Sequence, residues 1–209
     1  MLALDVPRGA ERLLVVLHGY GDDVTLLPAA VQANRPLRLW DVAAPTGPTR
    51  CAVGRAWFPS APEDDGPPLV DVLDALAEAV SQACANHALD SRRVAVLGWS
   101  QGAATALALA LRSANGRQPE WRPHMVVGLA AWLVNEPGVT FDLGAAARRG
   151  TAVGLVHGSL DDVVPVAQGR STFRALERHG LDVNWIERHA GHDLPPLLDA
   201  AGEWLQSRS

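Results

Sequence analysis

The sequence contains no lysine, so all 18 residues in the combined lysine and arginine count are arginines. A Schiff base with a carbonyl substrate or with pyridoxal phosphate requires a lysine amine, and that chemistry is therefore excluded. A P-loop is excluded for the same reason, because its lysine binds the nucleotide phosphates. Two large classes of enzyme are thus ruled out before any motif is considered.

Cysteine is scarce as well, with Cys51 and Cys84 as the only two among 209 residues. Two cysteines are too few for a disulfide framework or for a cysteine-based zinc site. Cys84 shares one face of a predicted helix with apolar residues, so we expect it to pack in the core.

Long apolar runs and runs of basic residues are also missing. No apolar stretch is long enough to cross a bilayer, so we expect no membrane span. The net charge is −5 and the arginines form no basic stripe, which argues against a nucleic-acid partner. Residues 1–10 include Asp5 and Pro7 and lack the apolar centre of a signal peptide, so we expect a cytoplasmic protein.

Strand-like and helix-like segments alternate along most of the chain. Short apolar runs typical of strands buried on both faces occupy residues 13–18, 37–43, 94–98, 125–130, 152–157 and 183–187. Helical patterns occupy residues 24–32, 69–84, 101–112, 166–178 and 193–206. This alternation predicts a doubly wound α/β fold, with a mostly parallel central sheet and helices on both faces. We expect residues 1–209 to form a single domain without a large cap domain.

The longest irregular stretch, residues 45–68, ends in a segment rich in proline, glycine and aspartate. Loops of α/β sheets gather into sites at the carboxyl ends of the strands. We therefore expect this stretch to shape one side of a site.

The segment Gly98-Trp99-Ser100-Gln101-Gly102 matches the pattern Gly-x-Ser-x-Gly. A predicted strand leads into it and a predicted helix leads out, which is the setting of a nucleophile elbow. The serine of such a turn takes a strained backbone conformation, and side chains two residues to either side would collide, so glycines are needed there. The alternative is that Ser100 merely caps a helix in an ordinary turn.

A serine nucleophile needs a base, and the base needs an acid that orients it; in this fold they follow in the order Ser, acid, His. An acid at Asp161 or Asp162 follows one buried strand, and a histidine at His189 or His192 follows the last strand. All these residues belong to loops at the same edge of the predicted sheet as Ser100. The sequence thus supplies every member of a triad, with one alternative each for the acid and the base.

The other histidines fit the role of base badly. His18 and His157 end strands but precede the acid in the chain. A metal site built from His189 and His192 with His18 or His157 is a further alternative, although the pair does not lie on a helix and no carboxylate spacing accompanies it. The remaining histidines, which we expect at the surface or at helix ends, are His87, His124 and His179.

A hydrolase of this kind also needs two backbone N–H groups that stabilise the oxyanion. The residue after the nucleophile, Gln101, supplies one, and the loop after the first strand supplies the other. That loop has glycines on both sides of Tyr20, whose N–H is the candidate. The alternative is a plain glycine turn in which Asp23 caps the helix at residues 24–32.

Three segments together resemble the phospholipase/carboxylesterase family, which includes the acyl-protein thioesterases. They are residues 17–22 (LHGYGD), 98–102 (GWSQG) and 157–165 (HGSLDDVVP), and Gly191-His192 fits the closing motif of the family. The resemblance extends over about residues 13–205, in the same order and spacing. It implies a compact α/β hydrolase that cleaves carboxylic esters or thioesters without a metal or another cofactor.

Carried over by position, the resemblance makes Ser100 the nucleophile, Asp161 the acid and His192 the base. It makes Tyr20 and Gln101 the backbone donors to the oxyanion. It also implies substrate-pocket residues, which are Trp57, Phe58, Trp132 and Leu133.

The chain departs from the family pattern near these pocket residues. Pro59 replaces the usual aspartate after the Trp-Phe pair, and Ala130-Ala131 stands where members often carry Ser-Gly. A bulky Trp132 would narrow the acyl site and favour short acyl chains.

We therefore expect a serine carboxylesterase whose partner is a small-molecule ester, as a monomer or a homodimer. Two alternatives keep the same triad: an acyl-protein thioesterase or lysophospholipase, and an acyltransferase. An alternative of another class is a catalytically silent binding protein with the same fold.

Overall fold

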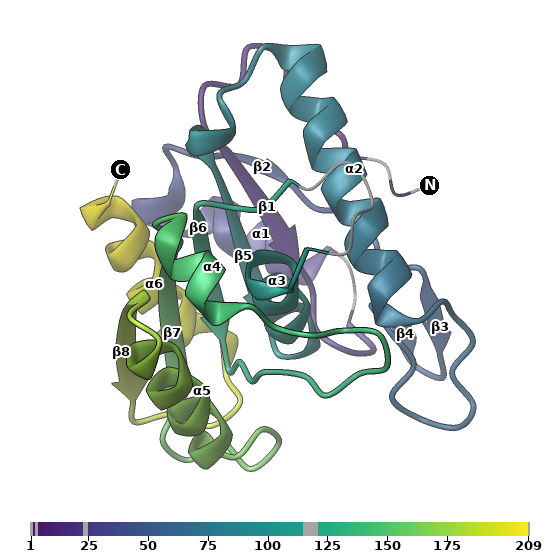
Figure 1. The fold of residues 1–209 in the computed structure, drawn as a ribbon, viewed down its shortest axis with the longest axis vertical. Coiled ribbons are helices and arrows are strands. Elements are labelled where there is room, and N and C mark those ends of the chain that lie inside the picture. The colour runs from purple at the N-terminus through teal and green to yellow at the C-terminus, as the bar shows by residue number, and fades with distance from the viewer. Residues whose placement is uncertain (1, 3, 23–24, 115–120, 209) are drawn as a thin grey trace.

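Six strands form the central sheet of this computed structural model, which describes residues 2, 4–22, 25–114 and 121–208 (Figure 1). Every neighbouring pair in the sheet is parallel, and the order is β2-β1-β5-β6-β7-β8. The strands are β1 (Leu13–Leu17), β2 (Asp41–Ala43), β5 (Val94–Trp99), β6 (Met125–Leu129), β7 (Ala152–Gly158) and β8 (Asp182–Arg188).

The direction of the strand order reverses between β1 and β5. From β1 the chain goes outward to β2, then crosses back to β5 and continues to β8. Open α/β sheets bind ligands at such a reversal, beyond the carboxyl ends of the strands. The loop that begins at His18 and the turn at Ser100 follow β1 and β5 directly, so both lie at this point.

Helices cover both faces of the sheet because the strand residues alternate between two apolar clusters. One cluster joins the sheet to α2 (Leu69–His87), α3 (Gln101–Leu111), α4 (Leu143–Arg148) and α5 (Val166–Arg178). The other joins it to α1 (Leu26–Ala33) and α6 (Leu194–Ser207). Figure 1 shows the first set in front of the strands and the second set behind them. The mostly parallel α/β fold predicted from the sequence is confirmed.

Helix α3 packs directly against β5, β6 and β1, and every one of its residues is buried. Its small side chains allow this approach: a Cβ atom added at Gly102 would lie 2.2 Å from the carbonyl oxygen of Leu17 in β1. The first turn of α3, which follows Ser100, is thereby fixed against the strand that leads into the loop at His18.

Three local predictions differ from the structure. The strand expected at residues 37–43 is confined to β2, because Pro36 lies in the first turn of a 3₁₀ helix (Arg35–Leu37) that ends before the strand. A two-stranded hairpin, β3 (Thr49–Cys51) and β4 (Gly54–Ala56), stands in the stretch expected to be irregular. Helix α4 was not expected because six residues give too short a periodic pattern. The expected cap Asp23 lies outside the described residues.

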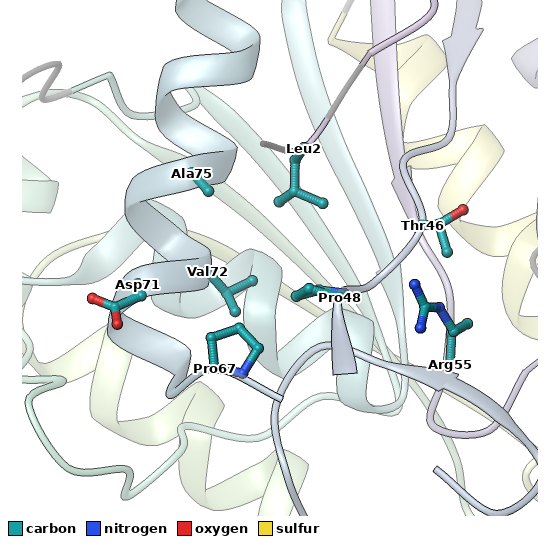
Figure 2. Close-up of a pocket in the computed structure, with 8 residues that line it drawn as sticks. All are labelled: Leu2, Thr46, Pro48, Arg55, Pro67, Asp71, Val72 and Ala75. Atoms are coloured by element: carbon teal, nitrogen blue, oxygen red, sulfur yellow. The ribbon is translucent and has the colours of Figure 1, made fainter. Parts of the chain in front are cut away.

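A cavity of about 430 Å³ lies beside the N-terminal half of α2 (Figure 2). Figure 2 shows Thr46, Pro48 and Arg55 on the side of the cavity that faces α2. The other lining residues are Leu2, Pro67, Asp71, Val72 and Ala75. Thr46 and Pro48 flank Gly47, which is important for the contacts of His18 described below.

No helix within the described parts of the chain is long and apolar enough to cross a membrane.

Candidate active site

Ser100 occupies a strained turn between β5 and α3. Its φ of 54° and ψ of −119° are unusual for a residue with a side chain, which marks a position where the surrounding structure holds the backbone. A Cβ atom added at Gly98 would lie 2.2 Å from the carbonyl oxygen of Gly102, so the turn closes only with glycine there. The backbone N–H of Ser100 donates to Leu129, the last residue of β6, at 2.9 Å. The geometry is that of a nucleophile elbow.

Asp161 and His192 form a hydrogen bond, with 2.8 Å between Oδ2 of the carboxylate and Nδ1 of the imidazole. The other oxygen of Asp161 accepts the N–H groups of Val163 and Val164, at 3.0 and 2.7 Å. Only 7% of Asp161 is exposed. Because a carboxylate only accepts, His192 carries its proton on Nδ1, and Nε2 remains as the basic nitrogen.

The two alternatives for these positions are exposed. Asp162 and His189 lie at the surface, whereas Asp161 and His192 are paired and partly or fully shielded from solvent. An acid that orients an imidazole works best when water does not compete for its oxygens, so the geometry favours Asp161 and His192.

His192 lies beside the elbow. Its ring stacks on that of Trp99, with 5.2 Å between centroids and 27° between planes, and Trp99 directly precedes Ser100. Within the described residues, no hydrogen bond joins the Ser100 hydroxyl to His192. Such bonds are often long without a substrate and tighten in the substrate complex.

The loop after β1 approaches Ser100 closely. A Cβ atom added at Gly19 would lie 3.7 Å from that of Ser100. The loop is fixed further along, because the Tyr20 hydroxyl donates to Oδ1 of Asp64 at 2.9 Å and the Gly21 N–H donates to Arg55 at 3.0 Å. The hydrogen bond to Asp64 raises the pKa of the Tyr20 phenol to about 12.

The side chain of Gln101 holds the segment after β4, a role that sequence analysis missed. Its oxygen accepts the N–H of Trp57, and its nitrogen donates to the carbonyl of Phe58 and the hydroxyl of Ser60, each at 2.8 Å. An extended amide with a donor and an acceptor suits this role, but nothing in the pentapeptide indicates it.

Trp57 and Phe58 are buried, with 0% and 4% of their surfaces exposed. Their described hydrogen bonds fix loops, and their assignment to the substrate pocket stays a prediction. Trp132 and Leu133 are half-buried and line a cavity of about 230 Å³ against α5. They follow β6, whose last residue, Leu129, bonds the N–H of Ser100.

His157 is a second residue whose contacts sequence analysis did not anticipate. It is fully buried at the end of β7, and its Nε2 donates to the carbonyl of Val164 at 2.8 Å. The same nitrogen lies 3.6 Å from Oδ2 of Asp161. His157 thus closes the loop that carries Asp161. No group of three or more potential metal ligands occurs among residues 4–22, 25–114 and 121–208.

A family model described as Phospholipase/Carboxylesterase matches residues 6–196. Esterase PE8 resembles the structure with a TM-score of 0.77 and 25% identity, over 99% of this chain and 98% of that one. Acyl-protein thioesterase 2 of Zea mays gives 0.71 and 26%, over 99% and 98%. The Bacillus cereus carboxylesterase gives 0.80 at 19% identity, over 100% and 95%, which is a likeness of fold. This chain belongs to the phospholipase/carboxylesterase family and is an enzyme that hydrolyses ester bonds.

Proposed function

We propose that this protein is a serine carboxylesterase in which Ser100 is the nucleophile, His192 the base and Asp161 the orienting acid. The observation that carries the proposal is the buried Asp161 carboxylate, bonded at 2.8 Å to an imidazole that stacks beside the Ser100 elbow. A serine that only capped a helix would need neither this pair nor a strained backbone.

In the proposed mechanism, Nε2 of His192 takes the proton of the Ser100 hydroxyl as its oxygen attacks the ester carbonyl. The N–H groups of Tyr20 and Gln101 stabilise the oxyanion of the tetrahedral intermediate. His192 then gives the proton to the departing alcohol, which leaves an acyl-serine. Water deprotonated by His192 attacks the acyl-serine. As this second tetrahedral intermediate collapses, His192 returns the proton to the Ser100 oxygen and the carboxylic acid is released.

Replacement of the nucleophile tests this assignment. We expect Ser100→Ala to retain the fold and to lose about 10³-fold or more in kcat on p-nitrophenyl acetate. Labelling by a fluorophosphonate probe, which reacts with the serine nucleophile, should also be lost in Ser100→Ala. The matched control is Ser81→Ala in α2, which should keep both activity and labelling. A Ser100→Ala protein that works at the wild-type rate would eliminate the triad, and a wild type that is neither labelled nor active would indicate a silent binding protein.

We propose esters of short-to-medium acyl chains as substrates. The support is Trp132, whose bulky ring lies on the segment that follows the Leu129 contact with Ser100 and borders a cavity of only about 230 Å³. A larger pocket would be expected for a long acyl chain.

A series of p-nitrophenyl esters tests this substrate class. Wild type should prefer the shorter acyl chains, and Trp132→Ala should raise kcat/KM for an octanoyl ester relative to an acetyl ester by about tenfold. Trp121→Ala, at the other end of β6, is the matched control and should leave the ratio unchanged. An unchanged ratio in Trp132→Ala would remove Trp132 from the acyl site.

A thioesterase activity on the same triad is the second candidate. The 26% identity to the maize acyl-protein thioesterase over nearly the full length of both chains favours it. Rates for short esters, long-chain acyl thioesters and lysophospholipids, measured on one preparation, separate the candidates. The proposed carboxylesterase requires the highest kcat/KM on the short esters.

A further inference from the structure

His18 is a buried histidine for which the proposed catalytic steps have no use. Only 2% of it is exposed, at the junction of β1 and the loop that approaches Ser100. Both of its ring nitrogens have partners: Nε2 lies 3.0 Å from the backbone nitrogen of Gly47, and Nδ1 lies 2.7 Å from the carbonyl oxygen of Gly19. A buried imidazole with two backbone contacts is fixed in both position and orientation.

The partners determine which nitrogen carries the proton. The Gly47 N–H can only donate, so Nε2 of His18 must be an unprotonated acceptor. The Gly19 carbonyl can only accept, so Nδ1 must hold the hydrogen and donate it. His18 is therefore neutral, as the tautomer protonated on Nδ1. Protonation of Nε2 would place two donors against each other and break the bond to Gly47.

The carbonyl that His18 holds belongs to the same peptide group as the Tyr20 N–H. A peptide group is planar and trans, so its C=O and N–H point in opposite directions. A hydrogen bond that fixes the Gly19 carbonyl consequently fixes the direction of the Tyr20 N–H. This peptide group lies near the nucleophile, since a Cβ atom added at Gly19 would be 3.7 Å from that of Ser100.

We propose that His18 is a positioning residue for the oxyanion hole, which holds the Gly19–Tyr20 peptide group so that the Tyr20 N–H faces the reacting carbonyl. The inference rests on the proposed function, since it requires an oxyanion to form at Ser100. His18 touches neither the substrate nor the reacting atoms, and acts only through the loop.

The surroundings of His18 hold it in turn. The Trp57 ring lies 5.0 Å from the imidazole, and its Nε1 donates to the His18 carbonyl at 2.8 Å. The backbone N–H of Trp57 donates to the side chain of Gln101. One buried tryptophan thus connects the two segments that carry the proposed oxyanion donors, Tyr20 and Gln101.

The loop that carries Gly47 runs close to the backbone of Ala56, the last residue of β4. A Cβ atom added at Gly47 would lie 2.3 Å from the carbonyl oxygen of Ala56, so only glycine brings this N–H to the imidazole. Figure 2 shows the flanking residues, Thr46 and Pro48, with Arg55 beside them at the cavity. Gly47 therefore reaches the buried imidazole from a loop that also borders open space.

The charge environment agrees with a neutral imidazole. Burial has the largest effect on the pKa of His18 and lowers it, and the charge of Arg55 lowers it as well. The Gly19 carbonyl and Asp22 raise the pKa, but the lowering by burial outweighs their effect. Nε2 is thus kept free to accept from Gly47 near neutral pH.

Two amide substitutions separate the contacts of His18. In asparagine the amide nitrogen is attached to Cγ, at the position that Nδ1 has in histidine, so His18→Asn keeps a donor for the Gly19 carbonyl. In glutamine the amide oxygen lies two bonds beyond Cγ, at the position that Nε2 has in histidine, so His18→Gln keeps only the acceptor for the Gly47 N–H. We expect His18→Asn to retain kcat within about fivefold, and His18→Gln to lose about 10²-fold in kcat with KM changed less than about threefold.

A boronic acid that forms a tetrahedral adduct with the serine gives an independent readout. His18→Gln should weaken its binding by about the factor lost in kcat, and His18→Asn should not. His179→Gln is the matched control, because that histidine also bonds a backbone carbonyl through Nδ1 but is exposed at the end of α5. Equal losses in the two His18 variants, or a folded His18→Gln with wild-type kcat, would overturn the proposal.

Nuclear magnetic resonance of the wild type provides a test that does not depend on whether the variants fold. The ¹⁵N shifts of His18 at neutral pH should show a protonated Nδ1 and an unprotonated Nε2. A protonated Nε2 would contradict the proposal. These outcomes are distinguishable from failure of the proposed function: Ser100→Ala tests the triad, whereas the His18 variants are compared on an enzyme whose serine still reacts.

Discussion

At the scale of single residues, burial separates equivalent candidates from one another. Asp161 and Asp162 are neighbours with the same side chain, yet only Asp161 is buried and bonded to His192. His18 and His179 both bond a backbone carbonyl through Nδ1, but one lies in the core beside the elbow and the other at the surface. Two side chains of the same type can therefore take different roles, because burial and hydrogen bonds to the rest of the fold hold only one of each pair in a defined orientation.

Tyr20 provides a prediction at this scale because it is the only tyrosine in the chain. Its hydroxyl donates to Asp64, which stabilises the protonated phenol and raises its pKa to about 12. We expect a titration followed by tyrosinate absorbance to give a midpoint near that value in the wild type. In Asp64→Ala the midpoint should fall toward the ordinary value of 10.0. Tyr20→Phe supplies the baseline, and an unchanged midpoint in Asp64→Ala would show that the bond does not form in solution.

At the scale of elements, the contact between α3 and β1 determines where the elbow lies. Every residue of α3 is buried, and its second residue, Gly102, touches the backbone of β1. A side chain there would move the helix away from the strand, and with it the first turn that follows Ser100.

The substitution Gly102→Ala tests this contact. Because the added Cβ would lie 2.2 Å from the Leu17 carbonyl, we expect a loss of about 1–3 kcal/mol in the free energy of unfolding and a reduced kcat. Urea unfolding and esterase assays measure the two effects. Gly144→Ala in α4 is the control: its Cβ would meet the end of the Arg148 side chain at 3.3 Å and Oδ1 of Asp142 at 3.7 Å, and no backbone atom, so stability should be retained or rise. If both substitutions changed the free energy of unfolding and kcat equally, the contact between Gly102 and β1 would not determine the position of the elbow.

The element-scale predictions from sequence succeeded where apolar periodicity was long and failed where it was short. The pattern of Leu69, Leu73 and Leu76 gave α2, and the continuous apolar runs gave five of the six sheet strands nearly to their ends. The start of the run at residues 37–43 is taken up by the end of a 3₁₀ turn (Arg35–Leu37), because Pro36 favours a helical first turn, whatever the apolar character of its neighbours. The hairpin of β3 and β4 has three residues in each strand, too few for any period to be visible.

At the scale of the whole molecule, a buried neutral histidine couples stability to pH. Burial lowers the pKa of His18 below its ordinary value of 6.5 in the folded protein. The unfolded chain therefore binds a proton at this residue at higher pH than the folded protein does. The resulting contribution to stability is fully present above about pH 6.5 and is lost as the pH falls from there through the folded pKa.

Urea unfolding of the wild type and of His18→Asn over this range measures the coupling. We expect the free energy of unfolding of the wild type to decrease as the pH falls below about 6.5, and that of the variant to decrease less steeply, since asparagine does not titrate. Ser81→Ala, which removes no titratable group, should reproduce the slope of the wild type. Identical slopes in the wild type and His18→Asn would show that His18 titrates alike in the folded and unfolded chains.

The sequence by itself determined the fold class, the family and the set of candidate residues, because these depend on local patterns: apolar runs, helical periodicity, glycines around a serine, and the order of Ser100, Asp161 and His192. From the residues alone Asp161 and Asp162 stayed equivalent, and only the resemblance chose between them. The tertiary structure shows that Asp161 is the one that is buried and bonded to His192, and it reveals the contacts of His18, Gln101 and His157. Those distinctions come from burial and from hydrogen bonds between segments that are far apart in the chain. Gly47 and His18 are 29 residues apart, so no local sequence pattern could predict that the Gly47 N–H donates to Nε2 of His18.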